Sequence, residues 1–218
     1  MGPVNALRVT GNIMGMLTPL TFVGDDSALI QALGAGHPGA AATFYDRHSP
    51  HVLRALQSAL GLDEDLPDLL QDVFITAISQ IDDLHDVARV RPWLIGIAVF
   101  TARAHIRRRA RRTWLSVFSP AHASARQQEP PPSDARRALR EIYRILDGMP
   151  ADERLAFALR IIEGLTLPEV AEASRVSLAT VKRRLHRAER RFVERARLRP
   201  ELEHWLEKGT RWKAGSGG

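Results

Sequence analysis

The chain has 218 residues, with 31 Lys and Arg against 25 Asp and Glu and a formal net charge of +6. This length holds one or two domains, and the lack of cysteine excludes a disulfide framework and any cysteine-ligated metal site. No run of about 18 apolar residues occurs, so we expect no membrane insertion. Acids crowd residues 63–86, whereas bases crowd residues 103–112 and 175–199. This asymmetry predicts two different partners, one of them a polyanion.

The N-terminal segment fits a secretory signal poorly. Residues 1–24 hold apolar residues broken by Gly and Pro, with Arg8 as the single base. We therefore expect a disordered extension on a cytoplasmic protein. Helical periodicity dominates from residue 25 onward and predicts helices over residues 25–33, 38–60 and 66–81.

The third of these helices carries two carboxylates one turn apart. Asp68 and Asp72 share a face at spacing i and i+4. Paired carboxylates can serve acid–base catalysis, hold a metal or bind a partner. No His or Cys lies nearby in the sequence, which favours a partner-binding role.

A polar stretch, residues 82–91, precedes a fourth helix, whose first turn suits Pro92. Trp93 and Phe100 fall on an apolar side, and the start of the helix is apolar nearly all round, so we expect that part to be buried. Trp93 could stack an unpaired base, but its apolar neighbours favour the core. The helix ends in Arg107–Arg112, which is either a solvated end or a phosphate-binding segment; the absence of acids favours nucleic acid.

A Pro-rich segment, residues 114–133, predicts an extended linker. Helices are expected from residue 134 to about 147 and over residues 151–163. Residues 164–174 then predict a short helix, Arg175 and Val176 a tight turn, and Ser177 the N-cap of a long basic helix. We expect residues 199–218 to form a C-terminal tail.

The long basic helix has two contrasting faces. Its apolar stripe consists of Val181, Leu185, Ala188 and Phe192. The opposite face is cationic and suits a DNA major groove, where Arg and Lys donate to guanine and to phosphates. A solvated basic helix of an ordinary bundle is the alternative, but the preceding short helix and turn favour a helix-turn-helix.

Four segments in order resemble bacterial extracytoplasmic-function sigma factors, the compact two-domain group of the sigma-70 family. They are Phe44–His48, Asp68–Phe74, Pro92–Ala98 with its Arg-rich end, and Thr180–Ala188. The resemblance covers about residues 25–113 and 134–195. It implies an all-α fold: two small helical domains, at residues 25–113 and 134–198, joined by a flexible linker.

The resemblance also implies partners. The first domain would bind the clamp of core RNA polymerase and the melted -10 strand, and the second would bind the polymerase flap and the -35 duplex. An anti-sigma factor would hold the protein inactive. No cofactor and no catalysis by this chain are expected.

The site residues carried over from the resemblance fall into three groups. The polymerase-binding group is Asp68, Leu69, Gln71, Asp72 and Phe74. The -10 group is Asp86, Arg89, Arg91, Arg103, Arg107, Arg108 and Arg111. The -35 group is Ser177, Thr180, Lys182, Arg183, His186, Arg187 and Arg190.

The chain departs from the family pattern in the fourth helix. Val99 and Phe100 stand where the family often has Arg-Asn, which removes a polar group that could read a -10 base. Two other functions stay open on the residues alone. One is a conventional helix-turn-helix regulator with an N-terminal sensing or dimerisation domain, and the other is an enzyme with an appended helix-turn-helix, for which no nucleophile, phosphate loop or metal motif is found.

Overall fold

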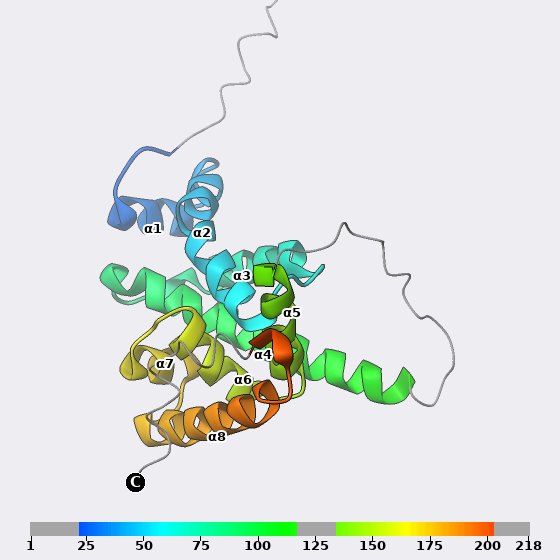
Figure 1. The fold of residues 1–218 in the computed structure, drawn as a ribbon. Coiled ribbons are helices and arrows are strands. Elements are labelled where there is room, and N and C mark those ends of the chain that lie inside the picture. Colours follow the sequence, from blue (N-terminus) through cyan, green and yellow to red (C-terminus); the bar gives the residue numbers. More distant parts are fainter. Residues whose placement is uncertain (1–21, 117–133, 203–218) are drawn as a thin grey trace, which may run out of the picture.

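A computed structural model describes residues 22–116 and 134–202, and the regular elements in these ranges are helices (Figure 1). We call residues 22–116 the N-terminal half and residues 134–202 the C-terminal half. The extension, linker and tail expected at residues 1–24, 114–133 and 199–218 lie largely outside the described residues.

The helices of the N-terminal half follow the sequence periodicity closely. They are α1 (Asp26–Gly34), α2 (Ala40–Leu60), α3 (Leu66–Ser79), the short 3₁₀ turns η2 (Ile81–Asp83) and η3 (Val87–Arg89), and α4 (Val90–Ser116). The polar stretch predicted before α4 therefore contains two single turns rather than an open loop. Asp25 caps α1, because its carboxylate Oδ1 accepts from the backbone N–H of Ala28 at 2.8 Å.

The C-terminal half contains α5 (Asp134–Asp147), α6 (Ala151–Phe157), the π-helical segment η4 (Ala158–Ile162), α7 (Leu167–Ser174) and α8 (Leu178–Ala196). Thr166 and Glu169 form a capping box at the start of α7. Hydrogen bonds from Thr166 to the Glu169 carboxylate lower the pKa of Glu169. The turn predicted between the two helices is confirmed: Arg175 ends α7 in the left-handed region, with φ 52° and ψ 47°.

One hydrophobic core extends through both halves. Phe44, Val52 and Leu56 of α2 are fully buried in the same cluster as Leu159 and Val170 of the C-terminal half. Figure 1 shows α4 lying between α2 and α3 on one side and α6 and α7 on the other. A second cluster joins α5, α6 and α8, where Phe157 stacks on Phe192 with ring centroids 4.9 Å apart. The two halves therefore form one packed body.

Polar contacts reinforce the junction of the halves. Arg154 is 3% exposed, and its Nε donates to the backbone oxygen of Ala59 at 2.7 Å. The Tyr143 hydroxyl donates to the backbone oxygen of Gln57 at 2.9 Å. Gly61 ends α2 with φ 78°, and a Cβ there would lie 2.8 Å from Cγ of Tyr143. Only glycine fits both this backbone conformation and this contact.

One side chain expected on a buried face is exposed instead. Phe100 of α4 is 69% exposed. In α4 the reason is geometric, because α2 and α3 cover one side and α6 and α7 another, which leaves a strip of the helix open to solvent. Periodicity identifies an apolar strip but not which neighbour covers it.

Candidate polymerase and nucleic-acid surfaces

The outer face of α3 is acidic and exposed. Asp68, Gln71 and Asp72 are exposed, and Ile75, 59% exposed, continues the same strip one turn on. Leu69 and Phe74, predicted with them to bind polymerase, are each 3% exposed and pack in the core. These two side chains hold the helix in place, so the surface available to a partner is narrower than predicted and gains an apolar residue.

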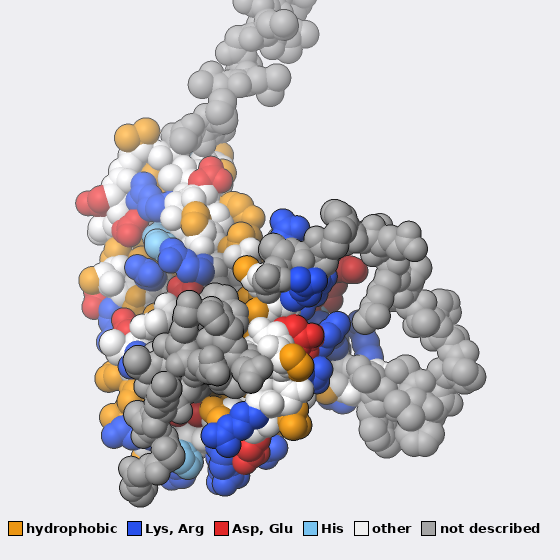
Figure 2. Space-filling view, viewed as in Figure 1, with side chains coloured by type: hydrophobic (Ala, Val, Ile, Leu, Met, Phe, Trp, Pro, Cys, Tyr) orange, Lys and Arg blue, Asp and Glu red, His pale blue; other side chains and the backbone are white. Residues whose placement is uncertain are grey.

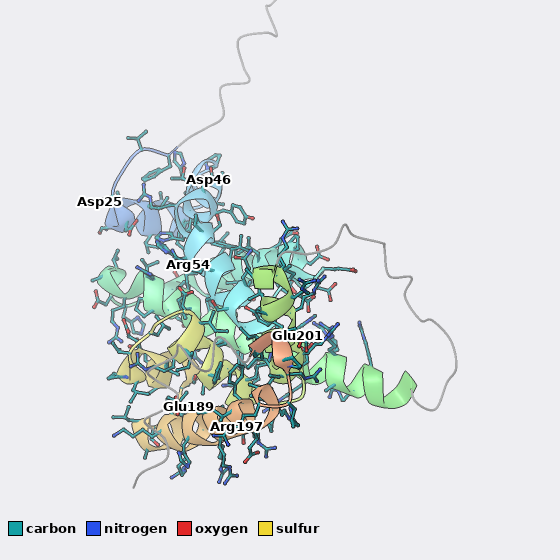
Figure 3. The ribbon with its side chains drawn as sticks, in the orientation of Figure 1. Asp25, Asp46, Arg54, Glu189, Arg197 and Glu201 are labelled. Carbon is teal, nitrogen blue, oxygen red and sulfur yellow. The ribbon has the colours of Figure 1, made fainter. Side chains whose placement is uncertain are left out.

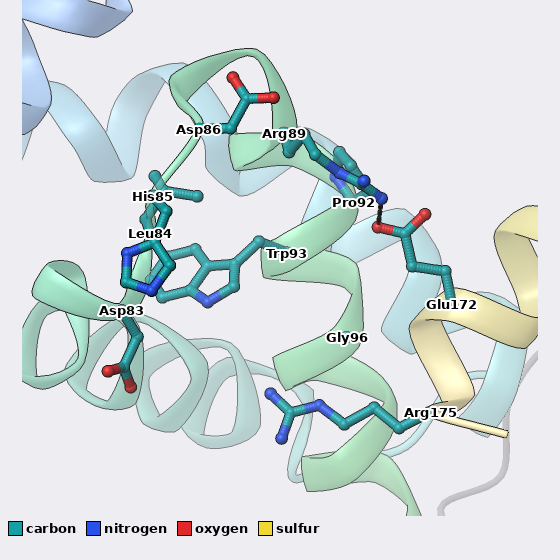
Figure 4. A pocket seen from close by; sticks show the side chains of 10 residues that line it. All are labelled: Asp83, Leu84, His85, Asp86, Arg89, Pro92, Trp93, Gly96, Glu172 and Arg175. Carbon is teal, nitrogen blue, oxygen red and sulfur yellow. Dashed lines mark hydrogen bonds and ion pairs between the residues drawn. The ribbon is translucent and has the colours of Figure 1, made fainter.

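A pocket lies where the polar turns η2 and η3 meet α4 (Figure 4). It has a volume of about 250 Å³. Its lining residues are Asp83, Leu84, His85, Asp86, Arg89, Pro92, Trp93, Gly96, Glu172 and Arg175. Eight of these belong to the N-terminal half and two, Glu172 and Arg175, come from α7 and the turn after it. The size and the mixture of aromatic and polar walls suit a planar, hydrogen-bonding group such as a base.

The walls of this pocket are fixed by local contacts. Asp86 caps η3, since its Oδ1 accepts from the backbone N–H of Ala88 at 3.0 Å. Trp93 is half-buried, so it both packs on the core and faces the pocket. Arg89 forms an ion pair with Glu172 across the junction, which Figure 4 shows as a dashed line.

The arginines of α4 divide into two sets. Arg103 and Arg107 pair with Asp152 of α6, with N–O distances of 2.8 Å and 3.6 Å. Arg91, Arg108 and Arg111 have exposed side chains. Asp152 also pairs with Arg184 of α8 at 3.1 Å, so one carboxylate lies among three guanidinium groups.

The basic face of α8 points away from the body. In Figure 2, Lys and Arg side chains gather at the lower end of the molecule, where Figure 1 places α8. Lys182, Arg183, His186 and Arg187 are exposed, whereas Val181, Ala188 and Phe192 are buried. Ser177 caps the helix, accepting from the N–H of Thr180 at 3.2 Å. The predicted -35 residues are thus brought together on one exposed face.

Two further members of α8 differ in how they are held. Arg190 is exposed, with its Nε 3.8 Å from the carboxylate of Glu194. Arg191, on the flank of the helix, pairs with Glu153 of α6, and its Nε lies 2.9 Å from the carboxylate. The Arg191 charge is therefore engaged inside the C-terminal half.

One cluster among the described residues has metal-ligand chemistry. Ligand atoms of Asp63, Asp65 and His105 lie within 4.8 Å of one another. His105 Nε2 is 3.1 Å from Asp63 and its Nδ1 is 3.7 Å from Asp65. Arg109 already pairs with Asp63 at 2.8 Å. Because a guanidinium occupies that carboxylate, we interpret the cluster as an ion-pair network tying the α2–α3 turn to α4.

Comparison with known families assigns both halves. The sigma-70 region 2 model matches residues 44–112, and the sigma-70 region 4 model matches residues 139–192. The ECF RNA polymerase sigma factor SigX of Bacillus subtilis (strain 168) is 31% identical over 148 residues, covering 66% of this chain and 76% of SigX. The chain belongs to the extracytoplasmic-function sigma factors of the sigma-70 family. It is an RNA polymerase sigma factor.

Other relatives of this sigma factor agree. The ECF RNA polymerase sigma-E factor of Escherichia coli (strain K12) is 28% identical over 172 residues, covering 75% of this chain and 90% of the relative. Two solved structures share its fold. CnrH, in complex with the cytosolic domain of CnrY, has a TM-score of 0.54 at 23% identity and covers 80% of this chain and 98% of CnrH. RpoE of Bartonella quintana, in complex with the anti-sigma factor NepR, has a TM-score of 0.54 at 21% identity, covering 72% and 97%.

The structure adds residues to this sigma factor's surfaces that sequence reasoning missed. Ile75 joins the α3 strip, and Glu172 and Arg175 join the pocket from the other half. Ile75 follows Gln71 and Asp72 at helical spacing, so the sequence alone could have placed it on the same face. Contacts between the two halves leave no local pattern in the sequence. Within the described ranges, no helix combines the length and apolar character that crossing a membrane requires.

Proposed function

We propose that three surfaces of this sigma factor divide promoter recognition among them. The acidic strip of α3 binds the clamp of core RNA polymerase, the pocket and α4 take the melted -10 strand, and the exposed face of α8 reads the -35 duplex. The observation that carries this proposal is the separation of charge. An acidic strip on α3 and a basic face on α8 lie on opposite sides of the shared helix α4.

The -10 role rests on the pocket. A base that leaves its stack needs a cavity with an aromatic wall and hydrogen-bonding groups. Trp93 and His85 supply flat faces, and Asp86 and Arg89 supply an acceptor and a donor. Arg108 and Arg111 are exposed near the other end of α4, where cationic side chains suit the phosphates of a single strand.

The -35 role rests on α8. Its N-terminus carries the partial positive charge of the helix dipole toward a phosphate. Arg183 and Arg187 are one turn apart on the exposed face, at the spacing that lets neighbouring side chains reach successive base pairs. Ser177 and Thr180 at the helix start are placed to bind the DNA backbone.

The remaining parts of the function follow the family. The protein acts in the cytoplasm, performs no catalysis of its own and is held inactive by an anti-sigma factor. The Bartonella quintana RpoE was solved with the anti-sigma factor NepR, and CnrH was solved with the cytosolic domain of CnrY. This supports a protein partner for the present chain as well.

The direct test is reconstitution. The full chain is mixed with core RNA polymerase, and transcripts from a genomic library are mapped at their 5′ ends. We expect co-elution with polymerase and transcripts that share -10 and -35 elements. A chain that binds duplex DNA but neither co-elutes nor supports transcription would be a conventional helix-turn-helix regulator instead.

The α3 assignment has its own test. Asp72→Arg reverses the charge of an exposed residue, so polymerase affinity should fall while helix content stays native. Asp46→Arg, on the exposed surface of α2, is the matched charge reversal outside the strip. Equal affinities of the two variants, both natively helical, would remove α3 from the interface.

A further inference from the structure

Arg175 combines a strained backbone with a place on the wall of the pocket. It has φ 52° and ψ 47°, and it is the only non-glycine residue with a positive φ among those that the structure describes. This conformation costs free energy for most residue types but not for glycine. A glycine would make the same turn without that cost, so the turn alone does not account for an arginine. Strained positions of this kind cluster at ligand sites.

The Arg175 side chain is available to a ligand. Figure 4 shows it running from the end of α7 toward α4, where Gly96 and Trp93 line the same pocket. Within residues 22–116 and 134–202, Arg175 makes no ion pair and no side-chain hydrogen bond. Its guanidinium therefore brings unused donors to the pocket wall.

Other charged groups of the pocket are already engaged. Glu172 pairs with Arg89, and Oδ1 of Asp86 accepts from the backbone N–H of Ala88 at 3.0 Å. Because these groups satisfy one another, they shape the wall more than they attract a ligand.

Two opposite charges and a flat ring are left for a ligand. Asp83, like Arg175, forms no ion pair with any described residue. A carboxylate accepts hydrogen bonds from an amino group, and a guanidinium binds phosphate. Trp93 is half-buried and offers a ring on which a base can stack. The complementary ligand has a planar ring that carries an amino group and is joined to an anionic group.

The pocket also limits the size of this ligand. Its volume is about 250 Å³. Pockets that take drug-sized molecules have roughly 300–1,000 Å³, so a dinucleotide or a larger cofactor is excluded. A single base fits, with its phosphate at the exposed guanidinium of Arg175.

We propose that this pocket binds a free nucleoside monophosphate whose base carries an amino group, such as AMP. The base stacks on Trp93 and donates to Asp83, while Arg175 binds the phosphate. Arg175 belongs to the C-terminal half and the other two residues to the N-terminal half, so the site is complete only where the halves are packed together. The inference goes beyond the promoter contacts proposed above and does not require them.

The first test is calorimetric titration of the full chain with AMP. We expect one site per chain and a melting temperature that rises with AMP concentration, since a ligand of the folded state stabilises it. Purine riboside 5′-monophosphate, adenosine and ribose 5-phosphate lack the amino group, the phosphate and the base, respectively. Each should bind at least about tenfold more weakly than AMP. No binding of AMP, or equal binding of AMP and ribose 5-phosphate, would overturn the proposal.

The second test removes the guanidinium together with the backbone strain. Arg175→Gly should keep or raise the melting temperature of the chain, while its affinity for AMP falls at least about tenfold. Arg197→Gly is the matched control, because Arg197 is exposed at the end of α8 and does not line the pocket (Figure 3). Equal AMP affinities of the two variants would show that Arg175 does not bind the phosphate.

The third test examines the amino group. Asp83→Ala should bind AMP and purine riboside 5′-monophosphate with equal affinity, because the acceptor that distinguishes them is gone. A retained preference for AMP would contradict the role of Asp83.

A -10 base is proposed for the same pocket, so the source of the nucleotide needs its own measurement. A free chain that binds a single-stranded -10 oligonucleotide but not AMP would assign the pocket to DNA and overturn the free-nucleotide site. The two proposals fail separately. Loss of transcription from the mapped promoters with AMP binding intact would refute the promoter roles alone, whereas normal transcription without AMP binding would refute the nucleotide site alone.

Discussion

Asp63 shows how one carboxylate can fix the relation of two helices. Its side chain is 7% exposed and contacts His105 and Arg109 of α4. Burial acts to raise the pKa of Asp63, but the N–H of Asp65 and the two basic side chains outweigh it, so the pKa is lowered from 3.8. A depressed pKa means that the ionised form stabilises the fold.

Asp63→Asn should therefore destabilise the protein at neutral pH, by about 1–3 kcal/mol for a lost charge-assisted hydrogen bond. The stabilisation by Asp63 is fully present above pH 3.8 and is lost as the pH falls through the lower native pKa. The difference in urea stability between wild type and variant should hence shrink below that pH. Asp65→Asn is the control, since Asp65 is 56% exposed and should change stability little. A pH-independent difference would contradict the expectation.

Phe100 is a second residue with a distinct role. It follows Gly96 by one turn on α4, on the same side as Trp93, and its ring is largely in solvent. We expect Phe100→Ala to weaken binding of a single-stranded -10 oligonucleotide by the holoenzyme, because stacking on an aromatic ring is worth about 1–3 kcal/mol per base. The melting temperature should not change. Leu62→Ala, another exposed apolar residue, is the comparison, and equal binding by the two variants would show that Phe100 takes no part.

At the scale of helices, the -35 role proposed for α8 can be tested by its sequence specificity. Arg183 is exposed, and its Nη2 donates to Thr180 at 3.1 Å. Arg183→Ala should lose discrimination at one -35 base pair, by about 1–3 kcal/mol for a bidentate contact to guanine. Arg190→Ala should weaken all sequences alike and reduce the salt slope by about one. The measurement is binding to a panel of -35 variants at several salt concentrations, and uniform loss in both variants would reassign Arg183 to the backbone.

The helices themselves were largely predictable. Apolar periodicity and end signals located α1 to α3 and α5 to α8 within a few residues, because capping and packing are local. The basic face of α8 and the tight turn at Arg175 followed from the same patterns. The burial of Leu69 and Phe74 and the exposure of Phe100 did not, since these depend on which neighbouring helix covers each strip. Two domains joined by a linker were expected, but nothing local in the sequence reports that their cores merge.

At the scale of the whole molecule, the packed body formed by the two halves depends on a glycine at the junction between them. Gly61→Ala places a methyl group 2.8 Å from the ring of Tyr143 and strains a backbone with φ 78°. We expect a loss of unfolding free energy larger than the about 1–3 kcal/mol that this sparsely populated, glycine-specific backbone conformation alone costs. A double-mutant cycle with Tyr143→Ala separates the two terms. If Gly61→Ala cost as much in the Tyr143→Ala background, the ring contact would play no part.

The position of α4 between the halves has a consequence for amide hydrogen exchange. When the two halves are packed together, α4 is covered by α2 and α3 on one side and by α6 and α7 on the other, and one side of α7 is covered by α4. Separation of the halves leaves α4 packed against α2 and α3, whereas α7 keeps only η4 and α8. Amides protected by packing exchange through the lowest-energy opening that frees them. The exchange rate of the α7 amides should therefore be set by separation of the halves. The α4 amides should exchange only through global unfolding.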